Sequence, residues 1–256
     1  MRAADLLVKC LEKEKVKYVF GIPGEEVLSL LDALSYSNIQ FVPTRHEQGA
    51  AFMANMVGRL TGKAGVCLAT LGPGSTNLMT GVADAMLDYS PLVAITGQTD
   101  LSKTHKQAHQ YIDIMEMFHP ITKWNSRITR PEVIPEMVRW AFKVAETEKP
   151  GATHLELSED GAATNVEGEP LEPTPVVYSE PNKGSILQAA KLIEESSYPM
   201  IIAGHGVIRR QANAELVALV QKVHLAVTNT FMGKGCVDYN KPYSLPTVGM
   251  HQRDWV

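Results

Sequence analysis

VCLATLGPGSTNLMTGVADAMLDYSPLVAIT, residues 66–96, predicts an apolar strand at 66–70, a glycine-rich turn, a helix at about 75–87 and a second apolar strand at 92–96. Strands of near-continuous apolar character that alternate with helices are typical of a parallel sheet covered on both faces. We therefore predict that this segment is one strand–helix–strand unit of such a sheet.

The same alternation continues on both sides of this unit. Towards the N-terminus the sequence predicts a helix at 4–11, a strand at 18–20, a helix at about 27–34, a strand at 39–42 and a helix at about 47–61. Towards the C-terminus it predicts a loop-rich stretch at 98–125 with a short helix at about 112–117, a helix at about 131–146 and a strand at 154–157. We expect an α/β domain built on an open parallel sheet with helices on both faces.

The domain organisation follows from where this pattern stops and restarts. Residues 1–162 are predicted to form the first domain, and residues 163–182, with Gly and Pro among acidic residues, a linker. Residues 183–256 begin a second α/β domain with a helix at 184–196, a strand at 200–203, a helix at about 210–222 and a strand at 225–228. Two strands and two helices are too few to cover both faces of a parallel sheet, so we expect this domain to be incomplete as written. Either the chain is a fragment or a partner supplies the rest.

The composition excludes several classes of protein. The 256 residues are 45% hydrophobic and 20% charged, with a formal net charge of -4, which fits a globular chain long enough to bury a sizeable core. The absence of a basic stripe argues against nucleic acid as a partner. The sequence has no apolar run of roughly 20 residues and no cleavable leader, so we expect a cytoplasmic protein that does not bind membranes. Small molecules are the better candidate partners.

No metal site is predicted. The cysteines Cys10, Cys67 and Cys236 are far apart in the sequence and are expected to be buried thiols. His105 and His109 are four residues apart but lack a third ligand.

The loops after the predicted strands are where a ligand is expected, because open parallel sheets bind ligands outside the carboxyl ends of their strands. The segment Gly72-Pro73-Gly74 follows a strand and opens a helix, as a dinucleotide-binding turn does. The third glycine of that fingerprint is replaced by Asn77, however, and Pro73 lacks a backbone donor. A tight turn without a ligand, capped by Ser75 or Thr76, also explains the glycines.

Glu47 is the candidate acid–base residue. It follows the strand at 39–42 and precedes an apolar helix start, so its carboxyl group is expected to face a poorly hydrated crevice. Burial favours the protonated carboxyl group, which is the condition for proton exchange near neutral pH. An acidic residue favoured by the helix dipole explains Glu47 equally well on physical grounds alone.

Four motifs in order give the chain a specific resemblance. They are VFGIPG at 19–24, RHEQGAAFMA at 45–54, GPGSTNL at 72–78 and PLVAITGQ at 91–98. Together they closely resemble the N-terminal pyrimidine-binding domain of thiamine diphosphate enzymes, in particular the acetolactate (acetohydroxyacid) synthase catalytic subunit. The resemblance covers residues 1–160 and continues more weakly into the second domain, through AGHG at 203–206 and MGKG at 232–235.

The resemblance implies a role for each matching residue. Glu47 matches the glutamate that hydrogen-bonds N1′ of the aminopyrimidine and promotes loss of the C2 proton of the thiazolium. Gln110 matches a glutamine at the substrate end of the site. The remaining matches are implied to bind the cofactor, with the glycine–proline turn against the pyrimidine ring: Pro23, Gly24, Gly72, Pro73, Gly74 and Asn77.

The implied activity is decarboxylation of pyruvate and ligation of the product to a second 2-keto acid, as in branched-chain amino acid biosynthesis. The family also implies a homo-oligomer, at least a dimer, in which Glu47 faces the diphosphate-binding domain of another subunit. That domain would hold magnesium and the diphosphate, and its Gly-Asp-Gly motif does not occur in residues 1–256. The isolated chain is therefore expected to be nearly inactive.

Two departures from the family keep alternatives open. Lys149 stands before Pro150-Gly151 where FAD-binding members carry Arg, which makes FAD doubtful as a cofactor. Glu25 stands where some 2-keto acid decarboxylases have an acidic side chain. A related 2-keto acid decarboxylase or pyruvate oxidase is thus one alternative, and a non-catalytic truncated domain that dimerises with a full-length relative is another.

Overall fold

The computed structural model describes residues 1–175 and 177–249. The chain divides into two compact units, Met1–Tyr178 and Ser179–Val256, which we call the first and the second unit. Residue 176 of the predicted linker and residues 250–256 of the predicted second domain lie outside the described residues.

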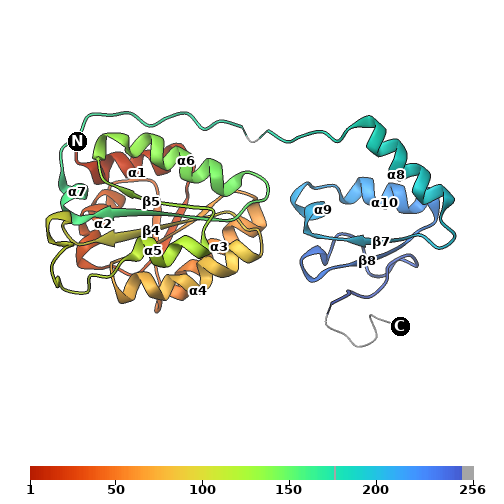
Figure 1. Ribbon diagram of the computed structural model, residues 1–256, viewed down its shortest axis with the longest axis horizontal. Helices are drawn as coiled ribbons and strands as arrows, with labels where there is room; N and C mark the ends of the chain where they lie inside the picture. Colours follow the sequence, from red (N-terminus) through yellow and green to blue (C-terminus); the bar gives the residue numbers. More distant parts are fainter. Residues whose placement is uncertain (176, 250–256) are drawn as a thin grey trace. The chain divides into compact units, whose positions relative to one another are not determined.

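The first unit is built on a six-stranded, fully parallel sheet (Figure 1). Its strand order is β2-β1-β3-β4-β6-β5. The strands are β1 (Tyr18–Gly21), β2 (Gln40–Pro43), β3 (Gly65–Ala69), β4 (Leu92–Gln98), β5 (Trp124–Ile128) and β6 (Ala152–Ser158). The central strands β3, β4 and β6 are buried along their whole length, as their continuous apolar sequences predict.

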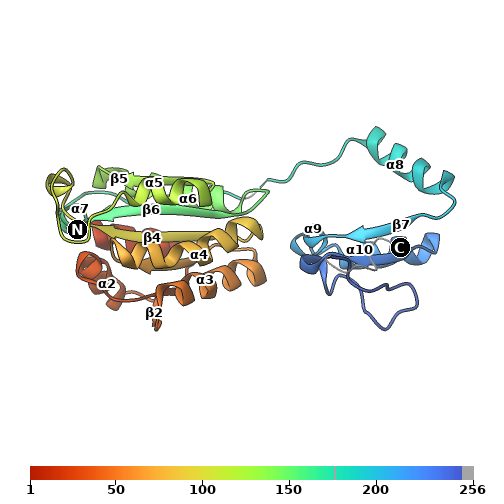
Figure 2. The ribbon, with the colours of Figure 1, turned by 60° about the horizontal axis from the view of Figure 1, so that its bottom comes forward.

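Helices cover both faces of this sheet, which confirms the predicted fold class (Figures 1 and 2). One face packs against α1 (Ala3–Lys13), α2 (Leu28–Ser35), α6 (Ile134–Glu146) and α7 (Glu159–Ala163). The other face packs against α3 (Glu47–Thr61), α4 (Pro73–Leu87) and α5 (Ile114–Phe118). Short 3-10 turns connect them: η1 (Glu25–Val27), η2 (Leu101–Lys103), η3 (His119–Ile121) and η4 (Pro131–Val133).

The strand order reverses between β1 and β3, and we call the position outside the carboxyl ends of these two strands the crevice. The chain leaves β1 for β2 on one side of it and then crosses over through α3 to β3 on the other side. Such a point of reversal opens a crevice outside the carboxyl ends of the two strands. The loop into η1 and the turn into α4 both begin there.

The start and the packing of α3 and α4 follow from particular residues. His46 caps α3, its Nδ1 accepting a hydrogen bond of 3.1 Å from the backbone N–H of Gln48. Pro73 occupies the first turn of α4, where its missing N–H removes no hydrogen bond from the helix. Gly81 of α4 lies so close to Ala51 of α3 that a Cβ at position 81 would come within 2.6 Å of the Ala51 methyl group. The two helices therefore pack in close contact, with their N-termini at the crevice.

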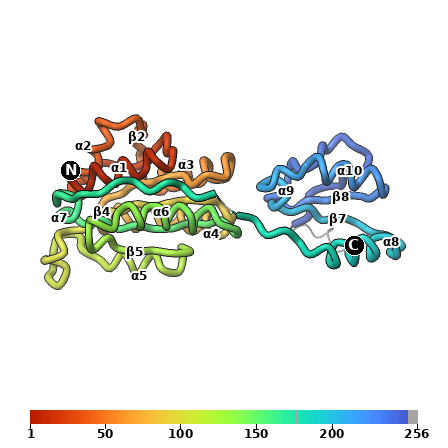
Figure 3. Tube along the Cα trace, turned by 90° about the horizontal axis from the view of Figure 1, so that it is seen from above, coloured from red at the N-terminus to blue at the C-terminus, as the bar shows by residue number. Residues whose placement is uncertain are grey.

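Two parts of the first unit differ from the sequence-based expectation. The stretch predicted as loop up to residue 125 contains the start of β5, an edge strand that pairs only with β6 among the described residues. Residues 164–174, within the predicted linker, lie along α1 and α6 (Figure 3). Val166 is only 6% exposed there, and its N–H donates to the carbonyl of Met1 over 2.8 Å.

Up to residue 249, the second unit contains two parallel strands, β7 (Met200–Ala203) and β8 (Ala226–Asn229). Its helices are α8 (Lys183–Glu195), α9 (His205–Arg209) and α10 (Asn213–Val223), followed by the 3-10 turn η5 (Phe231–Gly233). The core is small and consists of Ala203, Val220, Val227, Cys236 and Val237.

The structure also bears on the cysteines, on membrane-spanning helices and on metal sites. Cys10, Cys67 and Cys236 are all buried free thiols, as expected. In the described parts of the chain, no helix is long and apolar enough to span a membrane. Residues 1–175 and 177–249 also contain no group of three or more His, Cys, Asp or Glu side chains placed to hold a metal ion.

Candidate active site

Glu47 is the first residue of α3 and lies at the crevice, with 9% of its surface exposed. Its Oε2 accepts a hydrogen bond of 3.0 Å from Nδ2 of Asn77 on α4. Its Oε1 has no hydrogen-bond partner in the described part of the chain. A buried carboxylate with one oxygen bound and one free is suited to meet a donor on a ligand.

The turn from β3 into α4 lies directly against this carboxylate. A Cβ at Gly74 would stand 3.4 Å from Glu47 Oε1 and 2.9 Å from Cγ2 of Thr70. Gly72 has φ +53°, a conformation that favours glycine. Gly72 and Gly74 are buried and carry no side chain, and we call this turn beside the free oxygen of Glu47 the ledge.

Two further loops meet the same turn. A Cβ at Gly24, in the loop after β1, would stand 2.5 Å from Cβ of Thr70. Gln110 contacts the turn from the other loop, because its backbone carbonyl lies against Gly72. Gln110 itself has φ +55° and an exposed side chain.

The structure thus brings most of the predicted site residues together. Glu47 accepts a hydrogen bond from Asn77 and lies beside Gly74. Gly24 approaches the same turn through Thr70, and Gln110 approaches it at Gly72. Pro23 and Pro73 are exposed at the ends of the two loops.

The sequence reasoning missed two polar residues at this site. Thr70 ends the apolar run of β3 and contacts both Gly24 and Gly74. Its hydroxyl donates a hydrogen bond to Oε2 of Glu26, on η1. The available signal was a single hydroxyl residue at the end of a buried strand, immediately before a glycine-rich turn.

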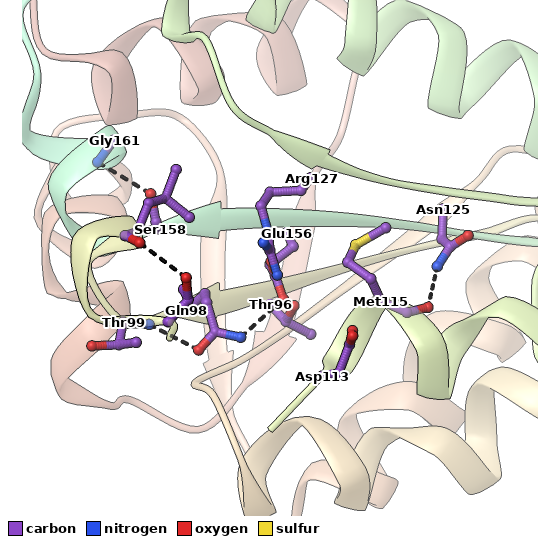
Figure 4. A network of polar contacts seen from close by, with 12 residues as sticks. Thr96, Gln98, Thr99, Asp113, Met115, Asn125, Arg127, Glu156, Ser158 and Gly161 are labelled. Atoms are coloured by element: carbon purple, nitrogen blue, oxygen red, sulfur yellow. Dashed lines mark hydrogen bonds and ion pairs between the residues drawn. The ribbon is translucent and has the colours of Figure 1, made fainter. Parts of the chain in front are cut away.

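A buried polar network secures the neighbouring loop that carries Gln110 (Figure 4). Glu156 on β6 is fully buried and pairs with Arg127 on β5 and with Nε2 of Gln98 on β4, the latter over 3.2 Å. The same Nε2 donates to the carbonyl of Ile112 over 3.2 Å. Burial raises the pKa of Glu156, while its contact with Arg127 opposes that shift. Through Gln98, this network fixes the chain two residues after Gln110.

A cavity of about 780 Å³ lies at the opposite edge of the sheet. It is lined by residues that precede β1 and β3, such as Lys15 and Lys63. Three ion pairs lie within its walls, Arg139 with Glu14, Lys63 with Glu146 and Lys13 with Glu172. It contains none of the candidate residues.

The free Oε1 of the buried Glu47 can accept a hydrogen bond from a ring nitrogen of a ligand, and the neighbouring ledge carries no side chain at Gly72 or Gly74. Residues 1–117 match the family described as thiamine pyrophosphate enzyme, N-terminal TPP binding domain. Residues 186–255 match the central domain of the same enzymes. The chain belongs to the thiamine pyrophosphate enzymes.

Similar proteins of this thiamine pyrophosphate enzyme family come from archaea and bacteria. The chain is 44% identical to a probable acetolactate synthase large subunit from Methanocaldococcus jannaschii, over 98% of the chain and 44% of the relative. It is 39% identical to an acetolactate synthase from Arthrospira platensis, over 96% of the chain and 44% of the relative. It is 38% identical to the acetolactate synthase isozyme 1 large subunit of Escherichia coli, over 97% of the chain and 44% of the relative. The chain thus spans less than half the length of these relatives.

Proposed function

We propose that the chain is part of an acetolactate-synthase-like enzyme that uses thiamine diphosphate to decarboxylate pyruvate and to join the product to a second 2-keto acid. The observation that carries the proposal is the free Oε1 of the buried Glu47 beside the Gly74 ledge. The names of the relatives support the choice of acetolactate synthesis over other reactions of the family.

In this proposal Glu47 holds and moves a proton at N1′ of the pyrimidine ring. Asn77 donates to Oε2 and so keeps the carboxylate oriented with Oε1 towards the ring. Gly72, Pro73 and Gly74 support the ring, and Pro23 and Gly24 border it from the loop after β1. When bound, thiamine diphosphate supplies the electron sink that makes loss of carbon dioxide from a 2-keto acid possible.

Gln110 is proposed to contact the substrate. Its exposed side chain extends from a loop that contacts the ledge at Gly72, so a molecule bound over the ledge comes within its reach. An amide can donate to the carboxylate or the keto oxygen of a 2-keto acid.

We further propose that residues outside 1–256 hold the diphosphate and Mg²⁺, so that these 256 residues alone are nearly inactive. FAD is not part of the proposal, because Lys149 stands where the family's FAD-binding members carry Arg. The enzyme is proposed to work in the cytoplasm, in the synthesis of branched-chain amino acids.

An apolar strip on α3 supports a homo-oligomer, at least a dimer. Phe52, Met53, Met56 and Leu60 lie along the helix that begins with Glu47 and are 36%, 46%, 44% and 77% exposed. Exposed apolar side chains in such a row are typical of an interaction surface. A partner subunit covering this strip would also close the crevice to water near Glu47.

The test is product analysis with the complete enzyme, supplied with pyruvate, thiamine diphosphate, Mg²⁺, inorganic phosphate, FAD and dissolved oxygen. Acetolactate is the expected product. Acetaldehyde would instead indicate a decarboxylase, and acetyl phosphate a pyruvate oxidase. The absence of any product, together with assembly onto a longer relative in gel filtration, would favour a non-catalytic domain.

A further inference from the structure

Glu26 is a second carboxylate at the crevice. It comes from η1, on the side of the sheet that packs against α2, whereas Glu47 comes from α3 on the other side. Glu26 is half-buried, and its neighbour Glu25 is exposed. Within the described residues, the only side chain that forms a hydrogen bond with Glu26 is Thr70, whose hydroxyl donates to Oε2.

The position of Glu26 is restricted on two sides. A Cβ at Gly97, near the end of β4, would stand 3.2 Å from Cβ of Glu26 and 2.8 Å from Cγ1 of Val27. The side chain therefore lies over the carboxyl end of β4 and reaches β3 through Thr70. A larger residue at position 97 would displace it.

Thr70 connects Glu26 to the ledge, because it contacts both Glu26 and Gly74. With the hydroxyl of Thr70 bound to Glu26, the methyl group Cγ2 lies 2.9 Å from the Cβ position of Gly74. At Gly24 the nearest atom of Thr70 is its Cβ, at 2.5 Å, and Cγ2 and Oγ1 both lie 2.9 Å away. The carbonyl of Thr70 in turn accepts a hydrogen bond of 2.5 Å from Oγ of Ser75. The rotamer of Thr70 thus decides which of its atoms lies against Gly74.

We propose that Glu26 is a positioning residue for the acid–base group. By binding the hydroxyl of Thr70, Glu26 keeps the Thr70 methyl group against Gly74. Gly74 in turn lies beside Glu47, because its Cβ position is 3.4 Å from Glu47 Oε1. Loss of Glu26 frees the rotamer of Thr70, so the ledge moves relative to Glu47 and the carboxylate meets the ring nitrogen less well. This inference rests on the proposed role of Glu47 towards N1′.

The test measures how much the ring nitrogen N1′ contributes to the binding affinity. Dissociation constants of the complete enzyme with Mg²⁺ are determined by calorimetry for thiamine diphosphate and for an analogue in which N1′ is replaced by C–H. The wild-type protein is expected to bind thiamine diphosphate roughly tenfold to a hundredfold more tightly than the analogue, as one hydrogen bond to a charged group contributes. In Glu26→Ala this ratio is expected to fall to within about threefold of unity, even where both ligands still bind.

Matched variants separate positioning from general loss of structure. Glu26→Gln keeps an acceptor for the Thr70 hydroxyl and is expected to restore the ratio. Glu25→Ala removes the same charge one residue away and is expected to leave the ratio unchanged. Thr70→Val is expected to lower the ratio, and adding Glu26→Ala to it is expected to have no further effect, because both changes break the same contact.

The outcomes distinguish the two proposals. If the wild-type protein does not discriminate between the two ligands, the role of Glu47 fails and this inference fails with it. If the wild type discriminates and Glu26→Ala retains the full ratio, only the inference about Glu26 is overturned. A Glu26→Gln enzyme that folds but loses the ratio overturns it as well.

Discussion

Asn77 donates a hydrogen bond of 3.0 Å from Nδ2 to Oε2 of Glu47, which joins α4 to the first residue of α3. The contact links the two helices at their N-terminal ends, where both border the crevice. It occupies one carboxylate oxygen and leaves the other facing Gly74. The orientation of the proposed acid–base group is thus set by a neutral donor, which constrains the carboxylate without adding a charge.

Asn77→Ala is expected to lower kcat about tenfold, because the carboxylate loses a hydrogen bond that contributes about 1–3 kcal/mol. Asn77→Asp is expected to be worse, since a second carboxylate next to Glu47 favours a proton held between the two groups. Steady-state kinetics with pyruvate measures both variants. Thr80→Ala, an exposed substitution on the same helix, serves as the control. Unchanged turnover in Asn77→Ala would show that the contact does not orient Glu47.

Gly74→Ala is expected to weaken cofactor binding at least tenfold, because its methyl group would lie 2.9 Å from Thr70 Cγ2 and 3.4 Å from Glu47 Oε1. Gly49→Ala is the matched control. Gly49 is also helical but has no atom within 4 Å of its Cβ position, so alanine there should stabilise α3 by up to about 1 kcal/mol. Calorimetric titration with thiamine diphosphate and urea unfolding measure the two effects. If the two variants had similar affinities for thiamine diphosphate, the cofactor would not bind against Gly74.

Arg127→Met is expected to reduce the free energy of unfolding by about 3–5 kcal/mol, because it leaves the fully buried Glu156 without its charged partner. The double variant Arg127→Met/Glu156→Leu removes both charges and is expected to recover most of that loss. Urea unfolding, followed by the fluorescence of Trp124 and Trp140 in the first unit, provides the comparison. A double variant as unstable as Arg127→Met would mean that packing of the arginine side chain, and not the unpaired carboxylate, dominates.

His154 makes the stability of the first unit depend on pH. Burial lowers the pKa of its imidazole from 6.5 to about 3 in the folded protein, where the ring stacks on Phe118 with centroids 4.1 Å apart. Between these two values the unfolded chain binds more protons than the folded one, so the contribution of His154 is fully present above pH 6.5 and is lost as the pH falls. From pH 7 to pH 5 the wild type is expected to lose about 2 kcal/mol more than His154→Gln.

Urea unfolding at the two pH values measures this difference, since the contributions of other groups cancel between wild type and variant. His119→Gln, an exposed histidine of the same unit, should follow the wild type. Parallel pH profiles for wild type and His154→Gln would mean that the buried imidazole takes up a proton without unfolding.

Most of the first unit could be predicted because its strands are buried and its helices amphipathic. The segment 47–61 was predicted as a helix with the ends that the structure has, since His46 caps it and Gly62 ends it with φ +70°. The strand β5 was missed because an edge strand pairs on one side only and carries polar residues such as Asn125 and Arg127. A continuous apolar run, the signal used for the other strands, does not exist there.

The candidate site was predictable only in part. The positions of Glu47 and of the turn at 72–74 after predicted strands indicated that they lie at the same edge of the sheet. Physical grounds alone left their roles open, and the proposed roles came from the family resemblance. Glu26 could not be distinguished from Glu25, since both are acidic residues in the same loop and only the 3-10 turn η1 decides which of them reaches Thr70. The contact between Gln110 and Gly72 depends on backbone conformation with positive φ at both residues, which no side-chain pattern indicates.

The most direct test of the account compares the wild-type complete enzyme with Glu47→Gln in two measurements on the same preparation. Glutamine keeps the shape of the side chain and an acceptor for Asn77 but cannot exchange a proton. The account predicts an unchanged midpoint of urea unfolding and a fall in kcat of at least a hundredfold, about the size of a lost acid–base contribution. Near-normal turnover of pyruvate by folded Glu47→Gln would contradict the assignment of the acid–base role and, with it, the proposed site.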